Sequence, residues 1–276
     1  MINVLRLEFF RLKKSKLFWI LLGVTALLPV ISALATTLIL SVIDAITSSG
    51  SEMSGALEQF RSAVTTSIMS SLGMIGYGAT LLPLITASVA LSKEFADGTM
   101  RNAILANKKR SELYFAYVTV AFTVGAAYMS AFMMTSLIII APIYGFGDLT
   151  AGQIVSAIFC SLALGLLSIA FAQSCVCMFL FAVRKQWATI LFPILITLLV
   201  PDIMQTAIIL ITTILGFQGD TLSYTAMSWI PFYNASLFNA GAIDGALVGK
   251  IALYDLLFTA VFTVSGYFTF EKADLK

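Results

Sequence analysis

Few residues in this 276-residue sequence could carry chemistry, and the clearest are polar side chains set inside long apolar segments. If those segments cross a membrane, each polar group costs free energy in hydrocarbon and is a candidate for lining a substrate pathway. Gln173 is expected to bond a neighbouring helix in preference to a substrate, and Asp255 could equally lie near the outer headgroups. Asp202 follows Pro201 and could mark a helix break. The candidates for a substrate pathway are Tyr77, Gln173, Asp202 and Asp255.

The sequence offers no set of residues for metal binding or covalent catalysis. Histidine is absent, and the three cysteines, Cys160, Cys175 and Cys177, all lie in one apolar stretch, where they are expected to serve as small packing residues. Residues 245–251 come near a phosphate-binding loop but have the wrong spacing and no Ser or Thr after Lys250. We therefore expect a chain that is not an enzyme and that binds no metal or cofactor of its own.

The composition excludes a water-soluble fold. Hydrophobic residues make up 59% of the chain and charged residues 11%, and the mean hydropathy is +0.98, whereas soluble domains are about a quarter charged. The net charge of +2 indicates no polyanionic partner such as nucleic acid. A soluble enzyme, a secreted disulfide scaffold and a nucleic-acid-binding domain are therefore excluded, and membrane lipids must surround this chain.

The apolar segments are long enough to cross a bilayer, which takes about 20 residues in a helix. Span five is ambiguous because Pro201 and Asp202 interrupt it. Either one kinked helix covers 187–215, or a helix ends near Asp202 and residues 203–217 re-enter the outer leaflet. The expected fold is an all-α membrane protein with six spans, forming a single domain over residues 1–276. The other spans are expected at residues 17–43, 67–91, 113–140, 154–183 and 251–270.

Basic residues set the expected orientation, because Lys and Arg near helix ends stay on the cytoplasmic side. All of the 16 Lys and Arg residues except Arg61 and Lys250 lie in the N-terminal segment, after spans two and four, or in the C-terminal tail. Both termini are therefore expected in the cytoplasm, with the chain crossing the cytoplasmic membrane an even number of times. The first apolar run is too long for a cleaved signal peptide, so we expect it to be retained as a span.

The connection between spans two and three has the most structure in its sequence. Asp97 and Gly98 offer a turn, and Thr99 is a suitable N-cap for a short amphipathic helix. A soluble partner could grip that helix and move two spans together; the alternative is a basic loop that contacts phospholipid. The residues expected to carry such coupling are Glu94, Asp97, Gly98, Thr99, Met100, Arg101 and Ile104.

This connection resembles a motif of the ABC-2-type transporter permeases. In that family the segment is the coupling helix, which docks on an ATP-binding cassette subunit. One departure is that the family often has a lysine a few residues into the third span, where this chain has Tyr117. The matching residues are Glu94, Gly98, Thr99, Arg101 and the run 110–113 at the entry to span three.

Residues 1–16 are similar to the interfacial helix of the same family. Their apolar face consists of Ile2, Leu5, Phe9 and Leu12, with basic residues elsewhere on the helix. The six spans and the broken stretch before the last one also match the family. The resemblance therefore covers the whole chain.

The resemblance implies the membrane subunit of an ATP-driven exporter. Two permease subunits, identical or related, would work with ATP-binding cassette subunits, which hold the ATP and magnesium. The expected cargo is hydrophobic or amphipathic: a peptide, a drug or a lipid-like molecule. The main alternative is a secondary transporter or channel without an ATPase, although such proteins usually show deep ionisable residues and repeated halves. An intramembrane enzyme would need a catalytic constellation that this sequence lacks.

Overall fold

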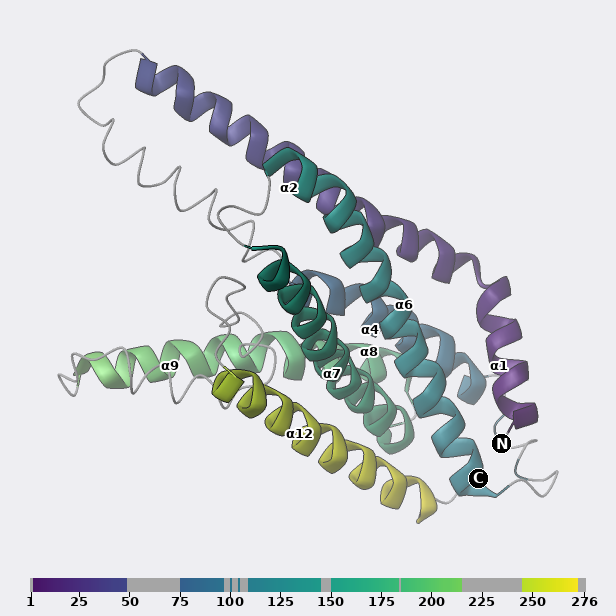
Figure 1. Ribbon diagram of the computed structural model, residues 1–276. Helices are drawn as coiled ribbons and strands as arrows, with labels where there is room; N and C mark the ends of the chain where they lie inside the picture. The colour runs from purple at the N-terminus through teal and green to yellow at the C-terminus, as the bar shows by residue number, and fades with distance from the viewer. Residues whose placement is uncertain are drawn as a thin grey trace.

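The computed structural model describes residues 2–48, 75–96, 100, 104, 109–144, 150–183, 185–214 and 245–272. Within these residues every regular element is helical (Figure 1). The all-helical prediction is therefore confirmed for the described part of the chain. The elements are α1 (Ile2–Lys14), α2 (Lys16–Ser48), α4 (Ile75–Ala96), α6 (Arg110–Tyr144), α7 (Ala151–Val183), α8 (Gln186–Ile194), the π-helical turn η1 (Leu195–Leu199), α9 (Val200–Ile214) and α12 (Gly245–Glu271).

Four of these helices are long and apolar enough to cross a membrane: α2, α6, α7 and α12. They contain 33, 35, 33 and 27 residues, more than the roughly 20 that a bilayer requires. They correspond to predicted spans one, three, four and six. Predicted span two is described from residue 75 onward, as α4. By length and composition these four helices suit a multi-pass membrane protein, and the count of six spans stays a prediction.

Helix α7 lies at the centre of the bundle and packs against α12, α6, α4 and α8. It contains no charged residue, and half of its length is buried, including small residues such as Ser161, Gly165 and Ala172. Small side chains let neighbouring helices approach closely, which is how helices associate where lipid removes the hydrophobic driving force. The position of α7 therefore follows from its composition.

The ambiguous fifth span is one helical path from Gln186 to Ile214, because α8, η1 and α9 follow one another without a gap. In η1 the Val200 N–H donates to the Leu195 carbonyl, five residues back. Pro201 has no N–H to donate, and a widened turn just before it is a usual way to accommodate a proline in a membrane helix. The structure follows the first alternative, a single irregular helix, and not a helix that ends at Asp202.

A second proline determines how α8 meets α4. Pro193 cannot donate to the carbonyl of Thr189, one turn back, so that oxygen lacks its helical partner. The Ser88 hydroxyl of α4 donates to this Thr189 carbonyl over 2.9 Å, and Ser88 is buried. The proline therefore frees the acceptor that joins the two helices.

A buried tyrosine on α6 joins three helices. The Tyr128 hydroxyl lies 2.9 Å from Thr86 Oγ1 of α4 and donates to the Phe18 carbonyl of α2 over 2.8 Å. The Tyr128 ring also packs edge-on against the Phe18 ring. A tyrosine supplies both apolar area and a polar end, and here both are used at one junction.

The last helix is held to α6 at two places. The Tyr114 hydroxyl donates to the Thr263 carbonyl over 2.7 Å, and the Arg110 guanidinium donates to the Glu271 carbonyl, also over 2.7 Å. The final carbonyls of a helix lack intrahelical partners, so the Arg110 contact caps the C-terminal end of α12. The start of α6 and the end of α12 therefore lie at the same end of the bundle.

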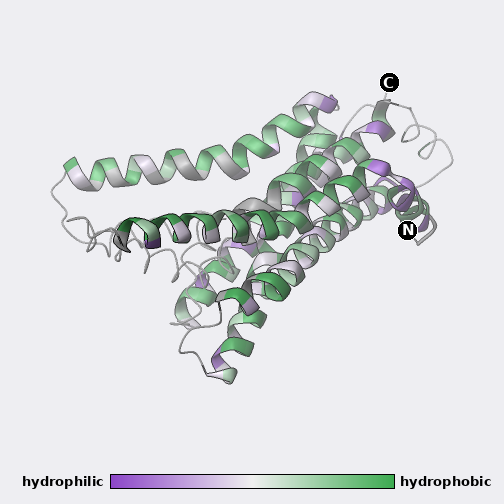
Figure 2. Cartoon of the chain, turned by 90° about the horizontal axis from the view of Figure 1, so that it is seen from above, coloured by the Kyte–Doolittle hydropathy of each residue, from purple (hydrophilic) through white to green (hydrophobic). Residues whose placement is uncertain are grey.

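That end of the bundle also carries the N-terminus and most of the basic residues. Figure 2 shows hydrophilic residues there, close to both chain termini. The Phe181 ring near the end of α7 lies 4.4 Å from the Phe270 ring and 5.7 Å from the Phe95 ring near the end of α4. The grouping of basic helix ends agrees with the charge pattern of the sequence; which side of the membrane they face stays a prediction.

Replacing Gly266 with alanine should destabilise the bundle. A Cβ atom at this position would lie 2.5 Å from the Tyr114 hydroxyl oxygen and 3.1 Å from Met178 Cα, a backbone atom of α7. Overpacking of this kind costs about 1–3 kcal/mol, so Gly266→Ala should lower the thermal unfolding temperature in detergent. Gly249→Ala on the same helix is the matched control, because nothing lies within 4 Å of its Cβ position. Equal unfolding temperatures for the two variants would contradict the close approach.

Candidate functional site

The connection between α4 and α6 is anchored in the bundle by two apolar residues. Met100 is 2% exposed and belongs to the main hydrophobic cluster, and Ile104 packs against that cluster from its edge. The backbone is helical at both positions. The sequence predicts that Met100 takes part in coupling; the structure places its side chain inside this chain's own core, where it anchors the segment to the bundle.

The other predicted coupling residues lie outside what the structure describes. Asp97, Gly98, Thr99 and Arg101 are not among the described residues, and Glu94 is described only in its backbone, as part of α4. Their role in coupling therefore stays a prediction. What the structure adds is the place where their neighbours Met100 and Ile104 enter the core.

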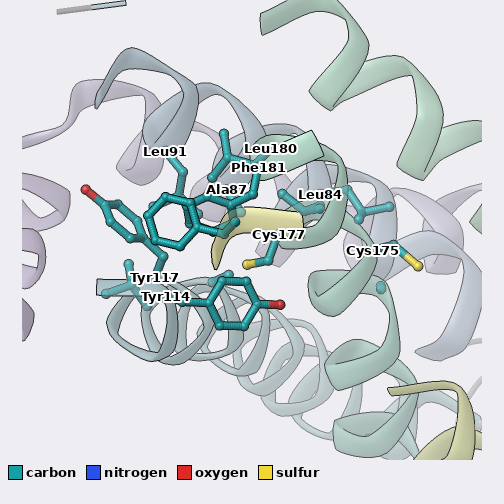
Figure 3. Close-up of a cluster of buried hydrophobic side chains, with 14 of the residues drawn as sticks. Leu84, Ala87, Leu91, Tyr114, Tyr117, Cys175, Cys177, Leu180 and Phe181 are labelled. Carbon is teal, nitrogen blue, oxygen red and sulfur yellow. The ribbon is translucent and has the colours of Figure 1, made fainter. Parts of the chain in front are cut away.

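We call the cluster that receives Met100 the basal core. Side chains of α4, α6 and α7 converge in it, as Figure 3 shows. The Phe181 ring of α7 contacts the Tyr114 ring at 5.1 Å and the Tyr117 ring at 6.0 Å. Its buried members are Leu84, Ala87, Leu91, Met100, Leu113, Tyr114, Tyr117, Val120, Ala121, Phe171, Ala172, Cys175, Val176, Cys177, Leu180, Phe181 and Phe270.

Two of the cysteines and Tyr117 are packing residues of the basal core. Cys175 and Cys177 are fully buried free thiols within it, and Cys160 is a partly buried free thiol on the same helix. The expectation that they are packing residues is confirmed for Cys175 and Cys177. Tyr117, which stands where the ABC-2 family often has lysine, is 2% exposed and packs its ring edge-on against Phe181.

Asp255 is completely buried between α12 and α7. Its Oδ2 atom accepts a hydrogen bond from the Ser168 hydroxyl over 2.7 Å, and its Oδ1 atom has no hydrogen-bond partner in the described part of the protein. The bundle shields this carboxyl from its surroundings, and its depth relative to the outer headgroups stays a prediction. Asp255 is a polar group held inside the bundle, and among the described residues its carboxyl is hydrogen-bonded by Ser168 alone.

Gln173 is buried at the contact between α7 and α6, and it is 2% exposed. Neither its Oε1 nor its Nε2 atom has a hydrogen-bond partner among the described residues. The hydrogen bond to a neighbouring helix that the sequence favoured is therefore not formed there. Gly125 of α6 makes room for the amide, because a Cβ at Gly125 would lie 3.2 Å from Gln173 Nε2 and 2.2 Å from Ile169 Cγ2.

The remaining two pathway candidates are described only in their backbone. Tyr77 lies in the first turn of α4, and Asp202 lies in α9 just after the π-helical turn. Asp255 belongs to α12 and faces α7, whereas Gln173 belongs to α7 and faces α6. Among the described residues, α7 therefore has two separate polar sites, one at Asp255 and one at Gln173.

The polar contacts that join the helices are not evident in the sequence. Tyr128, Ser88 and Arg110 reach backbone carbonyls of other helices, and Tyr114 does the same. Pro193 was the one signal in the sequence for such a contact. A proline in a helix leaves the carbonyl one turn earlier without its usual N–H donor. Nothing in the sequence identified which hydroxyl would fill it.

The fold and these sites define a class of protein. Long apolar helices form a bundle with its basic helix ends at one end, polar groups are buried inside it, and no group of His, Cys, Asp or Glu able to hold a metal occurs in the part that the structure describes. Such an arrangement is that of a multi-pass membrane protein.

The family is then identified by comparison. The family model described as ABC-2 family transporter protein matches residues 4–201, well over half of the chain. The chain therefore belongs to the ABC-2 transporter family, whose members are permeases, the membrane transport subunits of ABC transporters, and not catalytic chains. Membership also implies association with ABC ATPase subunits in general. Neither the curated proteins nor the solved structures gave a match to the chain.

Removing the Ser168 hydroxyl should cost stability because it leaves the buried Asp255 carboxyl without its partner. A buried polar group that loses its hydrogen bond costs about 1–3 kcal/mol, so Ser168→Ala should lower the detergent unfolding temperature. Ser174→Ala is the matched control on the same helix, since the buried Ser174 hydroxyl donates only to the Phe171 carbonyl one turn back. A larger loss for Ser174→Ala than for Ser168→Ala would refute this account of the α7–α12 contact.

Proposed function

We propose that this chain is the permease of an ATP-driven exporter in the cytoplasmic membrane, working as a pair of permease subunits with cassette ATPases. Its cargo would be hydrophobic or amphipathic, such as a peptide, a drug or a lipid-like molecule. ATP and magnesium would be held by the partner subunits. Family membership supports the permease role, and the direction, the cargo and the pairing are our extension of it.

The anchoring of the α4–α6 connection in the basal core is the observation that carries this proposal. Met100 and Ile104 come from the connection, and they pack in one cluster with α4, α6, α7 and the end of α12. A close-packed interior transmits displacement instead of absorbing it. A force applied to this short connection would therefore reach four helices and not only the two that it joins.

The mechanism follows from that contact. ATP binding would draw the two cassettes together, and the connection from Glu94 to Arg110 would carry the motion to the basal core. The bundle would then shift between an arrangement open to the inside and one open to the outside. For ATP binding to shift the bundle, the two arrangements must differ in their contacts with the cassettes. The surface of the cassettes would supply that difference.

The directions in which the described helices run agree with a topology of six spans. Helices α2 and α6 run away from the basal core, whereas α4, α7 and α12 run toward it, as the contacts of Phe18, Phe95, Phe181 and Phe270 indicate. Helix α8 begins beside α4 and leads away again through α9. This alternation supports six passages with both termini on the same side of the membrane, and the basic residues at that end favour the cytoplasmic side.

Asp255 and Gln173 would serve the cargo pathway. Both are buried, and both have polar atoms that no described residue binds. Such atoms are costly in a closed bundle and would be satisfied when the helices separate and admit water or a polar part of the cargo. The same Asp255 carboxyl is what a secondary transporter would use, and this is the one feature that favours the alternative function.

The coupling proposal is tested by charge reversal in the connection. Arg101→Glu should leave the chain inserted and folded but weaken its association with the ATPase, and cargo-stimulated ATP hydrolysis should fall about tenfold, which corresponds to about 1.4 kcal/mol of lost contact. Gly98→Val should act in the same direction by blocking the turn. Basal hydrolysis should change less, because the motor itself is intact.

Lys272→Glu is the matched control, since Lys272 is an exposed residue at the same end of the bundle but outside the connection. It should leave stimulation near the wild-type level. If Arg101→Glu and Gly98→Val insert normally and keep full transport and full stimulation, the connection is only a basic loop. Transport driven by an ion gradient without ATP would instead establish the secondary transporter.

Orientation has its own test. In a background with Cys160, Cys175 and Cys177 replaced by alanine, single cysteines at Ser51 and Thr221 should react from outside intact cells with an impermeant thiol reagent. A cysteine at Asn107 should react only after the membrane is opened, because Lys and Arg are retained on the cytoplasmic side. Labelling of Asn107 from outside would reverse the proposed topology.

A further inference from the structure

The N-terminal helix α1 has two faces of different chemistry, and the structure reverses the role expected for one of them. Val4, Leu5, Phe9 and Leu12 pack against the basal core, although an interfacial helix was expected to turn this apolar face to lipid. Glu8 on the same face is 6% exposed and pairs with Arg11 over 3.2 Å. The apolar face is therefore already covered by protein, which leaves the opposite face as the one that meets the surroundings.

We call that opposite face the α1 outer face: Arg6, Leu7, Phe10, Lys13 and Lys14. At 100° per residue these positions fall within about a third of the helix circumference. Leu7 is 49% exposed and Phe10 is 56% exposed, and the three basic residues are exposed as well. The Lys14 Nζ atom lies 4.5 Å from the centre of the Phe10 ring.

A tryptophan extends the α1 outer face onto the next helix. Trp19 of α2 is 54% exposed, and its indole N–H donates to the Lys13 carbonyl over 2.8 Å. In the next turns beyond Trp19 the exposed surface of α2 is largely apolar, with Ile20, Leu27 and Ile31 each more than half exposed. Since α2 is one of the membrane-spanning helices, the α1 outer face joins the lipid-facing surface without a break.

We infer that the α1 outer face binds the headgroups of anionic phospholipids. Water would be a poor surrounding for exposed leucine, phenylalanine and tryptophan side chains, and hydrocarbon would be a poor one for three basic groups. The boundary between the two suits both, because aromatic rings settle at headgroup depth and basic residues attract anionic lipid. Arg6 and Lys13 have no acidic partner among the described residues, so lipid phosphate can supply their countercharge.

This inference does not depend on coupling to an ATPase. It has a functional consequence nevertheless, because the other face of α1 is packed on the same basal core that receives Met100. Anionic lipid would hold α1 against that core from outside. The charge of the membrane surface would then influence how firmly the basal core is assembled.

Quenching of tryptophan fluorescence by brominated lipids tests the inference directly. A full-length Trp187→Phe, Trp229→Phe variant leaves Trp19 as the one fluorophore among the three tryptophans. It is reconstituted in bilayers of phosphatidylcholine and phosphatidylglycerol in which one lipid or the other carries brominated chains. Quenching by brominated phosphatidylglycerol should indicate a local preference of at least about fivefold, the ratio equivalent to about 1 kcal/mol. Replacing Arg6, Lys13 and Lys14 together with glutamine should bring that ratio close to one.

A second reporter controls for general effects of the substitutions. With Trp19 and Trp229 replaced by phenylalanine, Trp187 at the start of α8 reports from a site that is also exposed, and neutralising α1 should leave its lipid preference unchanged. Unaltered detergent unfolding temperatures would show that the variants remain folded. Equal quenching of Trp19 by both lipids, or a preference that survives neutralisation, would overturn the inference. If neutralisation leaves the lipid preference intact but abolishes co-purification of the ATPase, the face belongs to that partner instead.

Discussion

Several of the contacts that join helices in this bundle are hydrogen bonds from side chains to backbone carbonyls. Tyr114, Tyr128, Ser88 and Arg110 each reach a carbonyl on another helix, at distances between 2.7 and 2.9 Å. In lipid no water competes for these groups. Every residue has a backbone oxygen that can accept a hydrogen bond, and the helix holds that oxygen in a defined position. The positions of α2, α4, α6, α8 and α12 depend on these few donors, and the apolar packing around α7 fills the space that they define.

The all-helical membrane fold, the family and the approximate limits of the long helices could be predicted from the sequence, because hydropathy, charge and a short motif determine them. What covers the apolar face of each helix, lipid or protein, could not be predicted from the sequence. A stripe such as Leu5, Phe9 and Leu12 has the same periodicity whether lipid or protein covers it. For the same reason the sequence placed Met100 on a contact surface, whereas the structure buries it in the basal core.

Buried polar residues were recognised as unusual but not assigned a partner. Asp255 was a candidate because a carboxyl group in a span is costly, yet Ser168, its partner in the structure, lies 87 positions away in the chain. Gln173 was expected to bond across helices, and its amide instead faces the gap left by Gly125. Pairings of this kind depend on helix rotation, and a rotation of one residue moves a side chain by 100° around the axis. Sequence patterns do not fix rotation that finely in helices that are apolar on every side.

The bundle is packed tightly at one end, in the basal core, and more loosely along the rest of its length. Its tightest ring contacts lie at one end, around Phe181, while α2 and α12 leave most of their length in contact with lipid. A pivot at one end magnifies displacement at the other: a tilt of about 5° in a helix of roughly 50 Å moves its far end by about 4 Å, with a rise of about 1.5 Å per residue. A small repacking around Phe181 would thereby become a displacement of several ångströms at the far ends of these helices.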